Sequence, residues 1–269
     1  MIMKGLELPK ESLVKCENTI MDAIVRVVEY SNSNGAVVAI SGGIDSALVA
    51  TLASRVVDVY GLILPDGASS RKEDMEHAED LAKSLGIDYE VIDIGGIVQS
   101  VYKSRPKVGP EECRLAYANV KSRTRMIMNY FAANLDGRVV LGTGNKTELM
   151  LGYFTKYGDG GVDLLPIGDL YKTRVWQLSR YVGVPEHIVT KAPSAGLWEG
   201  QTDEAEIGMP YRTMDEILYG TFDLGLTADQ LMIETGVDAA AIEKLMQRVK
   251  NSEHKRNMPQ IVSMNGVLP

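Results

Sequence analysis

Cysteine is scarce in this 269-residue sequence, since only Cys16 and Cys113 occur and they form no CxxC pair. Neither a disulfide framework nor a cysteine-ligated zinc site is therefore expected. The sequence also lacks any run of about 18 apolar residues, which a membrane-spanning helix would need. Its first residues, MIMKGLELPKESL, lack the apolar core of a signal peptide. These absences favour a cytoplasmic protein without a membrane partner.

Positive charge is also in short supply, because 28 Lys and Arg residues stand against 36 Asp and Glu residues and give a net charge of −8. Broad binding to a nucleic-acid backbone needs a basic surface, so no nucleic-acid partner is expected. Apolar residues make up 45% of the chain, enough to bury a sizeable core. The sequence shows no internal repeat and no low-complexity linker, so residues 1–269 are expected to form a single domain.

Apolar runs alternate with helical patterns in the first half of the chain. Apolar residues at helical spacing predict an amphipathic helix from about residue 10 to 31. Buried strands are expected in AVVAI, VVDVYGLILP, IDYEVIDI and GRVVLGT, with helices over 45–54, 71–86 and about 110–135 between them. This alternation predicts an α/β fold, a doubly wound parallel sheet flanked by helices. From about residue 172 to 251, a mainly helical C-terminal part is expected.

The segment SGGIDS, at 41–46, follows the first predicted strand. Ligands bind beyond the carboxyl ends of strands in open parallel sheets, glycines allow close backbone approach, and N–H groups at a helix start attract anions. Asp45 would repel a phosphate there unless a hard cation such as Mg²⁺ lay between them. The segment therefore predicts a pyrophosphate-binding loop with a metal ligand. On spacing alone, an ordinary strand–helix turn with Asp45 as a helix cap remains open.

A second glycine-containing segment, GTGNKTELMLGYFTKYGDGG, follows the fourth predicted strand. Gly142, Gly144 and Thr147 fall one glycine short of the GxGxxG dinucleotide fingerprint, which disfavours a Rossmann dehydrogenase. Glu148 is a candidate for a second metal carboxylate facing Asp45. The alternative for Glu148 is a solvated helix start, since glutamate favours the first turn of a helix.

The loop SGGxDS after a strand resembles the pyrophosphate loop (PP-loop) of the N-type ATP pyrophosphatases. Within that group the chain resembles the NAD synthetases over most of its length. The segments that carry this resemblance are NVKSRTRM, GTGNKTE, GYFTKYGDGGVDLLPI, PSAGLWEGQTDEAEIG and SEHKRNMP, in the family's order. GTGNKTE departs from the GTDHAAE form of one branch of the family but keeps the glutamate.

The resemblance implies an adenine nucleotide alpha hydrolase-like fold and an ammonia-dependent ligase. Such enzymes join ammonia to deamido-NAD with ATP through an acyl-adenylate, and they release NAD, AMP and pyrophosphate. The substrate carboxylate is the nucleophile, so no residue of the protein needs to form a covalent intermediate. The reaction is the final step of NAD biosynthesis.

The resemblance also implies roles for individual residues. ATP contacts are implied for Ile40, Ser41, Gly42, Gly43, Ile44, Asp45, Ser46, Thr143, Lys172 and Ser194, with Asp45, Lys172 and Ser194 as the catalytic set. Mg²⁺ is implied at Asp45 and Glu148. Contacts to deamido-NAD are implied for Asn119, Arg123, Lys156, Asp159, Asp163, His254 and Lys255.

A homodimer with its active site at the subunit interface is expected from the same resemblance. The long predicted helix carries an apolar row that suits a symmetric, self-complementary contact: Met126, Ile127, Tyr130 and Phe131. In such a dimer, His254 and Lys255 are expected to act on substrate that is bound mainly by the partner subunit.

Two other functions stay open from the residues alone. Another PP-loop enzyme, which modifies tRNA or forms a different amide, would favour a basic surface and reactive cysteines. A non-catalytic nucleotide sensor on the same fold would not need Asp45, Glu148 and Lys172 together.

Overall fold

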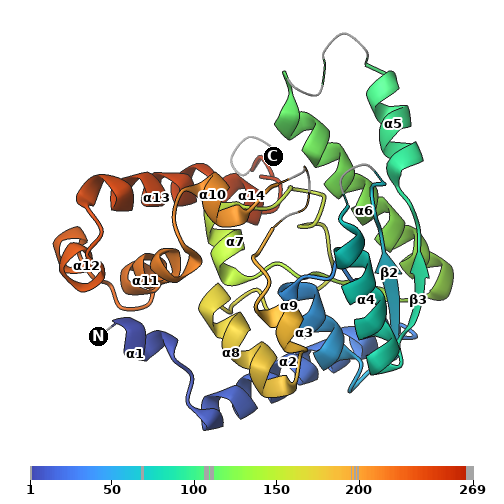
Figure 1. Cartoon of the computed structure of the whole chain (residues 1–269), viewed down its shortest axis with the longest axis horizontal. Helices are drawn as coiled ribbons and strands as arrows, with labels where there is room; N and C mark the ends of the chain where they lie inside the picture. Colours follow the sequence, from blue (N-terminus) through green and yellow to red (C-terminus); the bar gives the residue numbers. More distant parts are fainter. Residues whose placement is uncertain are drawn as a thin grey trace.

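The structure, a computed structural model, describes residues 2–67, 70–105, 109, 112–194, 196, 198 and 200–264 (Figure 1). Its strands are β1 (Ala36–Ala39), β2 (Val59–Ile63), β3 (Asp88–Val91) and β4 (Val139–Leu141). In the described part of the chain they form one parallel sheet with the order β3-β2-β1-β4. The chain thus moves outward from β1 to β3 and then returns to the other side of β1, so the strand order reverses between β1 and β4.

The helices before and between the strands are α1 (Ile2–Leu6), α2 (Lys10–Tyr30), α3 (Ile44–Ala53), α4 (Lys72–Leu85), α5 (Gly95–Lys103) and α6 (Arg114–Asp136). After β4 come α7 (Lys146–Leu151), α8 (Lys172–Val182), α9 (Glu186–Val189), α10 (Asp203–Ile207), α11 (Tyr211–Phe222), α12 (Ala228–Thr235), α13 (Ala239–Asn251) and α14 (Glu253–Arg256). The four predicted strands and the helical C-terminal part are confirmed. Residue 110, where the long helix was expected to begin, lies outside the described residues, and α6 begins at Arg114.

Alternating side chains of the strands pack into two apolar layers, one on each face of the sheet. In β1, Ala36 and Val38 join the layer built with α2, α3, α4 and α8, whereas Val37 joins the layer built with α5 and α6. Both faces of the strands are therefore covered, which is why they read as continuous apolar runs in the sequence. Cys16 of α2 is partly buried against the first layer, so the thiol is part of the core.

The C-terminal helices form a third apolar cluster around Tyr211, Met214 and Leu218 of α11, which are all fully buried. Figure 1 shows α11, α12 and α13 together at one end of the molecule, with α5, α6 and the sheet at the other. Leu151 of α7 and Tyr171, the residue before α8, belong to this cluster. The cluster therefore touches the same two helices that border the ligand-binding end of the sheet.

Among the described residues, no helix combines the length and the apolar composition that crossing a membrane requires.

Candidate active site

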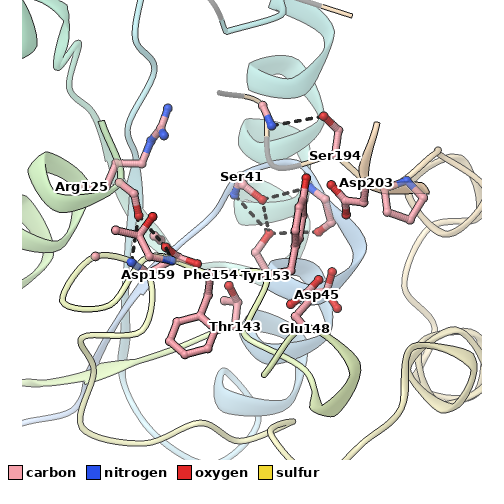
Figure 2. Close-up of a pocket in the computed structure, with 18 of the residues that line it drawn as sticks. Ser41, Asp45, Arg125, Thr143, Glu148, Tyr153, Phe154, Asp159, Ser194 and Asp203 are labelled. Atoms are coloured by element: carbon pink, nitrogen blue, oxygen red, sulfur yellow. Dashed lines mark hydrogen bonds between the residues drawn. The ribbon is translucent and has the colours of Figure 1, made fainter. Parts of the chain in front are cut away.

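A cavity of about 570 Å³ lies at the carboxyl ends of β1 and β4, where the strand order reverses (Figure 2). Parallel doubly wound sheets bind their ligands at such a reversal. The residues predicted to bind ATP that line this cavity are Ile40, Ser41, Gly43, Ile44, Asp45, Ser46, Thr143, Lys172 and Ser194. Gly42 lies behind the lining and shapes the loop from within.

The loop between β1 and α3 is held by two serine hydroxyls. Ser46 Oγ accepts a hydrogen bond from Ser41 N at 3.1 Å and donates one to Gly43 O at 3.0 Å. Gly42 has a φ of +75°, and a Cβ at this position would lie 2.1 Å from the Asp74 carbonyl oxygen. Only glycine fits there, so the loop turns tightly and α3 begins at the cavity wall. The N–H groups and the positive dipole end of this helix favour an anion in the cavity.

Asp45 and Glu148 converge on one buried ammonium group. Lys172, only 1% exposed, forms an ion pair with Asp45 Oδ2, and its Nζ lies 3.5 Å from Glu148 Oε1. Asn145 Nδ2 donates a hydrogen bond to Asp45 Oδ1 at 3.0 Å, which fixes the carboxylate from the other side. The two predicted metal ligands therefore face a common cation position, although they lie in the first turns of helices that follow different strands.

The charges of this trio are unbalanced. Burial raises the pKa of Glu148, the charge of Asp45 raises it further, and Lys172 opposes both. Burial alone would lower the pKa of Lys172, but the Asp45 and Glu148 carboxylates outweigh it and hold that pKa above its ordinary range. Lys172 thus stays charged, and the raised pKa of Glu148 indicates that this one ammonium does not fully offset burial and the charge of Asp45.

The donor set of this site fits Mg²⁺. Within the described residues, no cluster of three or more His, Cys, Asp or Glu side chains is arranged to hold a metal ion. Magnesium in nucleotide-binding sites usually takes only one or two protein carboxylates, and phosphate and water oxygens complete its coordination. Asp45 and Glu148 are such a pair, and an added cation would offset their mutual repulsion.

Glu148 also has a structural role at the start of a helix, as the alternative expectation for this residue required. It occupies the first turn of α7, where Asn145 is the N-cap residue, and the two residues form a reciprocal capping box. Glu148 Oε2 accepts from Asn145 N at 3.2 Å, while Asn145 Oδ1 accepts from Glu148 N at 3.0 Å. The side chain is only 16% exposed, however, so this carboxylate caps a helix and faces Lys172 at the same time.

Of the residues predicted to contact the dinucleotide, Asn119, Asp159 and Lys255 line the cavity. Asp159 Oδ1 accepts hydrogen bonds from Ser122 Oγ at 2.5 Å and from Thr155 N at 2.9 Å. Asn119 Oδ1 accepts from Thr155 Oγ1 at 2.7 Å. This network fixes the segment after α7 against α6, and Figure 2 shows Asp159 at the end of the cavity away from Asp203.

The C-terminal tail packs against the cavity of its own chain. Lys255 Nζ donates to Gly152 O at 2.7 Å and to Phe154 O at 2.8 Å, whereas the His254 carbonyl accepts from Lys156 Nζ at 2.6 Å. Lys255 also lines the cavity of its own chain, because one residue separates α13 from α14 and keeps the tail close to α7. The action of His254 and Lys255 on a partner's substrate stays a prediction.

Arg123, Lys156, Asp163 and His254 lie outside the cavity lining that the described residues form. Arg123 Nη2 donates to Lys156 O at 3.3 Å on the exposed side of α6. Asp163 Oδ2 accepts from Val140 N at 2.7 Å and Asp163 Oδ1 accepts from Tyr130 Oη at 3.0 Å. Asp163 thus ties β4 to α6.

Some cavity residues were not singled out from the sequence. Lys191 forms an ion pair with Asp74 and donates to Gly42 O at 3.3 Å, so it braces the pyrophosphate loop. Arg125 lies at the end of the cavity away from Asp203 (Figure 2). Burial raises the pKa of Asp203, whose carboxylate accepts a hydrogen bond from Tyr211 at 2.9 Å. The block GLWEGQTDE contains Asp203, but the sequence did not indicate which of its polar residues would face inward.

Comparison with known proteins decides the family. A sequence model described as NAD synthase matches residues 16–259, nearly the whole chain. The chain belongs to the NAD synthase family. It is 46% identical over 250 residues to the NH(3)-dependent NAD(+) synthetase of Methanosarcina acetivorans, and the match covers 92% of this chain and 97% of that protein.

Solved structures agree with this assignment and confirm the predicted fold of the chain. An NH3-dependent NAD synthetase from Campylobacter jejuni is 31% identical with a TM-score of 0.78, and the match covers 93% of this chain and 99% of that one. An NMN synthetase from Francisella tularensis is 33% identical with a TM-score of 0.82, over 93% of this chain and 98% of that one.

Proposed function

We propose that this protein amidates deamido-NAD with ammonia and ATP, and that it releases NAD, AMP and pyrophosphate. The observation that carries the proposal is the convergence of Asp45, Glu148 and Lys172 beside the SGGIDS loop in one cavity. A nucleotide sensor has no need for this charged trio, whereas release of pyrophosphate demands that negative charge be neutralised.

The pyrophosphate end of ATP is assigned to the loop between β1 and α3. This loop, residues 41–46, contains no basic side chain. The donors for phosphate oxygens are therefore the loop's backbone N–H groups, its serine hydroxyls and the N–H groups at the start of α3. Lys172 holds its ammonium beside the loop and neutralises charge that develops on the leaving group. Ser194 and Thr143 approach the same cavity from two other segments and are assigned as further ATP contacts.

Asp45 and Glu148 are assigned as the carboxylates that would hold Mg²⁺. When bound, this ion neutralises and orients phosphate oxygens of ATP. The assignment rests on their common orientation toward one cation position, which Lys172 marks, and on the excess negative charge of the pair.

Asn119, Asp159 and Lys255 are assigned to the substrate within the cavity, and Arg123, Lys156, Asp163 and His254 to its extension outside. The substrate carboxylate attacks the α-phosphorus of ATP, the bond to the β-phosphate oxygen breaks, and pyrophosphate leaves. Ammonia then attacks the acyl carbon, loses a proton and displaces AMP. The protein contributes by holding the reacting groups in line and by excluding competing water.

The same reasoning extends to the whole chain. The site draws Asp45 from the α/β core and Lys255 from the C-terminal tail, so we assign residues 1–269 to one functional domain. Both cysteines are free thiols, which suits the reducing cytoplasm where we place the enzyme.

The purified chain should make NAD from deamido-NAD, ATP, Mg²⁺ and ammonium, and it should make none from glutamine. Only NH₃ has the free lone pair that attacks the adenylate, so the rate at fixed total ammonium should rise with pH while the protein stays folded. Mass spectrometry that identifies NAD and follows its formation over time tests both statements. Glutamine-supported synthesis in an ammonia-free assay would contradict the first, and a rate that falls with rising pH would contradict the second.

The Francisella tularensis neighbour, an NMN synthetase, suggests a second candidate for the substrate that ammonia amidates, a mononucleotide. That neighbour is less similar than the relatives named for NAD, such as the Methanosarcina acetivorans protein at 46% identity. The acid forms of the mononucleotide and the dinucleotide should be compared as competing substrates in one reaction. A larger kcat/KM for the dinucleotide would support the proposal. A larger kcat/KM for the mononucleotide would overturn it in favour of the mononucleotide as substrate.

We also propose a homodimer with Arg123 at the contact. Of the predicted apolar row, Met126 lines the cavity, whereas Ile127 and Phe131 are each 57% exposed. Leu135 continues the same face of α6 and is 69% exposed. Arg123 lies on this face too, four residues before Ile127. An exposed apolar row of this kind on one helix suits a two-fold contact beside the substrate site.

Phe131→Asp should convert the dimer to a monomer in sedimentation velocity, because a charge would be buried in the apolar contact. The control is Ile233→Asp on α12, where the replaced side chain is 83% exposed and lies away from α6. Ile233→Asp should leave the dimer intact. A wild-type protein that sediments as a monomer at micromolar concentration would remove the premise.

A further inference from the structure

Helix α8 begins at Lys172, and the first N–H groups of a helix need acceptors from outside it. The N-cap residue Tyr171 supplies none, since among the described residues its side chain makes no capping hydrogen bond. The acceptors come from two other helices. Thr147 Oγ1 of α7 accepts from Lys172 N at 3.0 Å, and Asp215 Oδ2 of α11 accepts from Thr173 N at 2.7 Å.

Thr147 and Asp215 are also bonded to each other, because the Thr147 hydroxyl donates to Asp215 Oδ1 at 2.5 Å. Both residues are fully buried. Burial raises the pKa of Asp215 to about 6, while the Thr147 and Thr173 donors hold it down. Each oxygen of the carboxylate accepts one of the two hydrogen bonds, an arrangement that favours the ionised form, and bonds to an ionised acceptor are stronger than bonds to a neutral one.

The two helix starts that Asp215 joins carry groups of the charged trio. Glu148 follows Thr147 directly on α7, and Lys172 is the first residue of α8. The Lys172 Nζ to Glu148 Oε1 distance of 3.5 Å depends on how these two turns lie relative to each other. A misplacement of about 1 Å in a reacting constellation can cost roughly 10²-fold in rate.

We infer that Asp215 is a positioning residue that sets the separation of Lys172 and Glu148 through Thr147 and the start of α8. Neither Thr147 nor Asp215 belongs to the cavity lining formed by the described residues, so the effect is indirect. Asp215 lies among the buried apolar residues of α11, and it thereby links the C-terminal helical cluster to the reaction centre. The kinetic readout of this inference rests on the proposed function.

Asp215→Asn keeps the size of the side chain but replaces one acceptor oxygen with a donor, so it cannot accept both bonds. We expect kcat to fall by about 10- to 100-fold. The KM values for ATP and deamido-NAD should change by less than about threefold, since the ligand contacts remain. Thr147→Val, which removes only the hydroxyl, should lower kcat similarly, whereas Thr147→Ser should restore it. The double variant Asp215→Asn with Thr147→Val should be no slower than the slower single variant, because the two changes break the same connection between α7 and α8.

Leu218→Ala is the matched control. It removes a fully buried side chain from the same helix without touching the hydrogen bonds. It should lower the melting temperature and leave kcat unchanged where the protein is folded. A normal kcat for folded Asp215→Asn, or single-variant losses that multiply in the double variant, would overturn the inference. If Asp215→Asn fails to fold, Thr147→Val decides in its place.

Amide hydrogen exchange separates this inference from the proposed function. In the ligand-free Asp215→Asn protein, the amides of Lys172 and Thr173 should exchange faster relative to Val175 and Leu178, farther along α8. In Leu218→Ala, the α8 amides should change together. A wild-type chain that makes no NAD would refute the proposed function alone, whereas unchanged exchange at Lys172 and Thr173 would refute the positioning role alone.

Discussion

Asp45→Asn and Glu148→Gln should each lower kcat by roughly 10²- to 10³-fold, because each removes a ligand of the Mg²⁺ whose positive charge would stabilise the leaving pyrophosphate. Both should also raise the Mg²⁺ concentration needed for half-maximal rate, since an amide oxygen binds a hard cation less strongly than a carboxylate. NAD formation measured over a Mg²⁺ titration gives both quantities. The melting temperature of Asp45→Asn should stay near that of the wild type, because the change removes the repulsion between the two carboxylates and Lys172 keeps Glu148 as a counter-charge.

Matched controls exist on the surface. The Asp169 side chain is 95% exposed and pairs with Lys146, and the Glu186 side chain is 62% exposed and pairs with Arg180. Asp169→Asn and Glu186→Gln make the same chemical changes and should keep the wild-type kcat, since exposed ion pairs contribute little. A near-normal kcat for either cavity variant at saturating Mg²⁺ would rule out the metal role of that carboxylate.

The strands and most helices were predictable because their patterns are local. The αL position of Gly86, with a φ of +66°, ends α4 where the sequence predicted a stop. Helix α5 was missed, since it begins with Gly95 and Gly96, and glycine is a poor helix former. Its Val98 is fully buried against β1 and β2, so tertiary packing overrides the weak local preference.

The site was predictable only where one loop carried its own chemistry. Asp45 was recognised because a carboxylate in a phosphate loop is anomalous without a cation. That Glu148 would face it depends on β4 pairing with β1, which no local pattern encodes. Lys191 pairs with Asp74 over a separation of 117 residues, and Asp215 meets Thr147 over 68. Such partners are chosen by packing between distant elements, and their residue types alone do not identify them.

Lys172→Met should cause the largest combined loss of activity and stability. Methionine matches the length and the apolar stem of lysine, so the variant removes the charge while filling most of the space. Asp45 and Glu148 then lose their shared cation, and an uncompensated buried charge costs on the order of 3–5 kcal/mol of folding stability. A lower melting temperature and a loss of kcat beyond roughly 10²-fold are both expected.

Lys146→Met is the control, because Lys146 also contacts two carboxylates, Asp169 and Asp223, but outside the cavity lining that the structure describes. It should keep kcat near the wild-type value.

Added Mg²⁺ should raise the melting temperature of Lys172→Met more than that of the wild type, because it binds the native carboxylate pair and not the unfolded chain. Lowering the pH should reduce the difference in melting temperature between Lys172→Met and the wild type. Since burial and Asp45 raise the pKa of Glu148, the folded variant takes up a proton at a higher pH than the unfolded chain does, and this uptake removes the repulsion. Differential scanning fluorimetry over pH and Mg²⁺ measures both effects. A Lys172→Met protein that melts like the wild type without Mg²⁺, at a pH above the raised pKa of Glu148, would show that Lys172 does not hold two ionised carboxylates together.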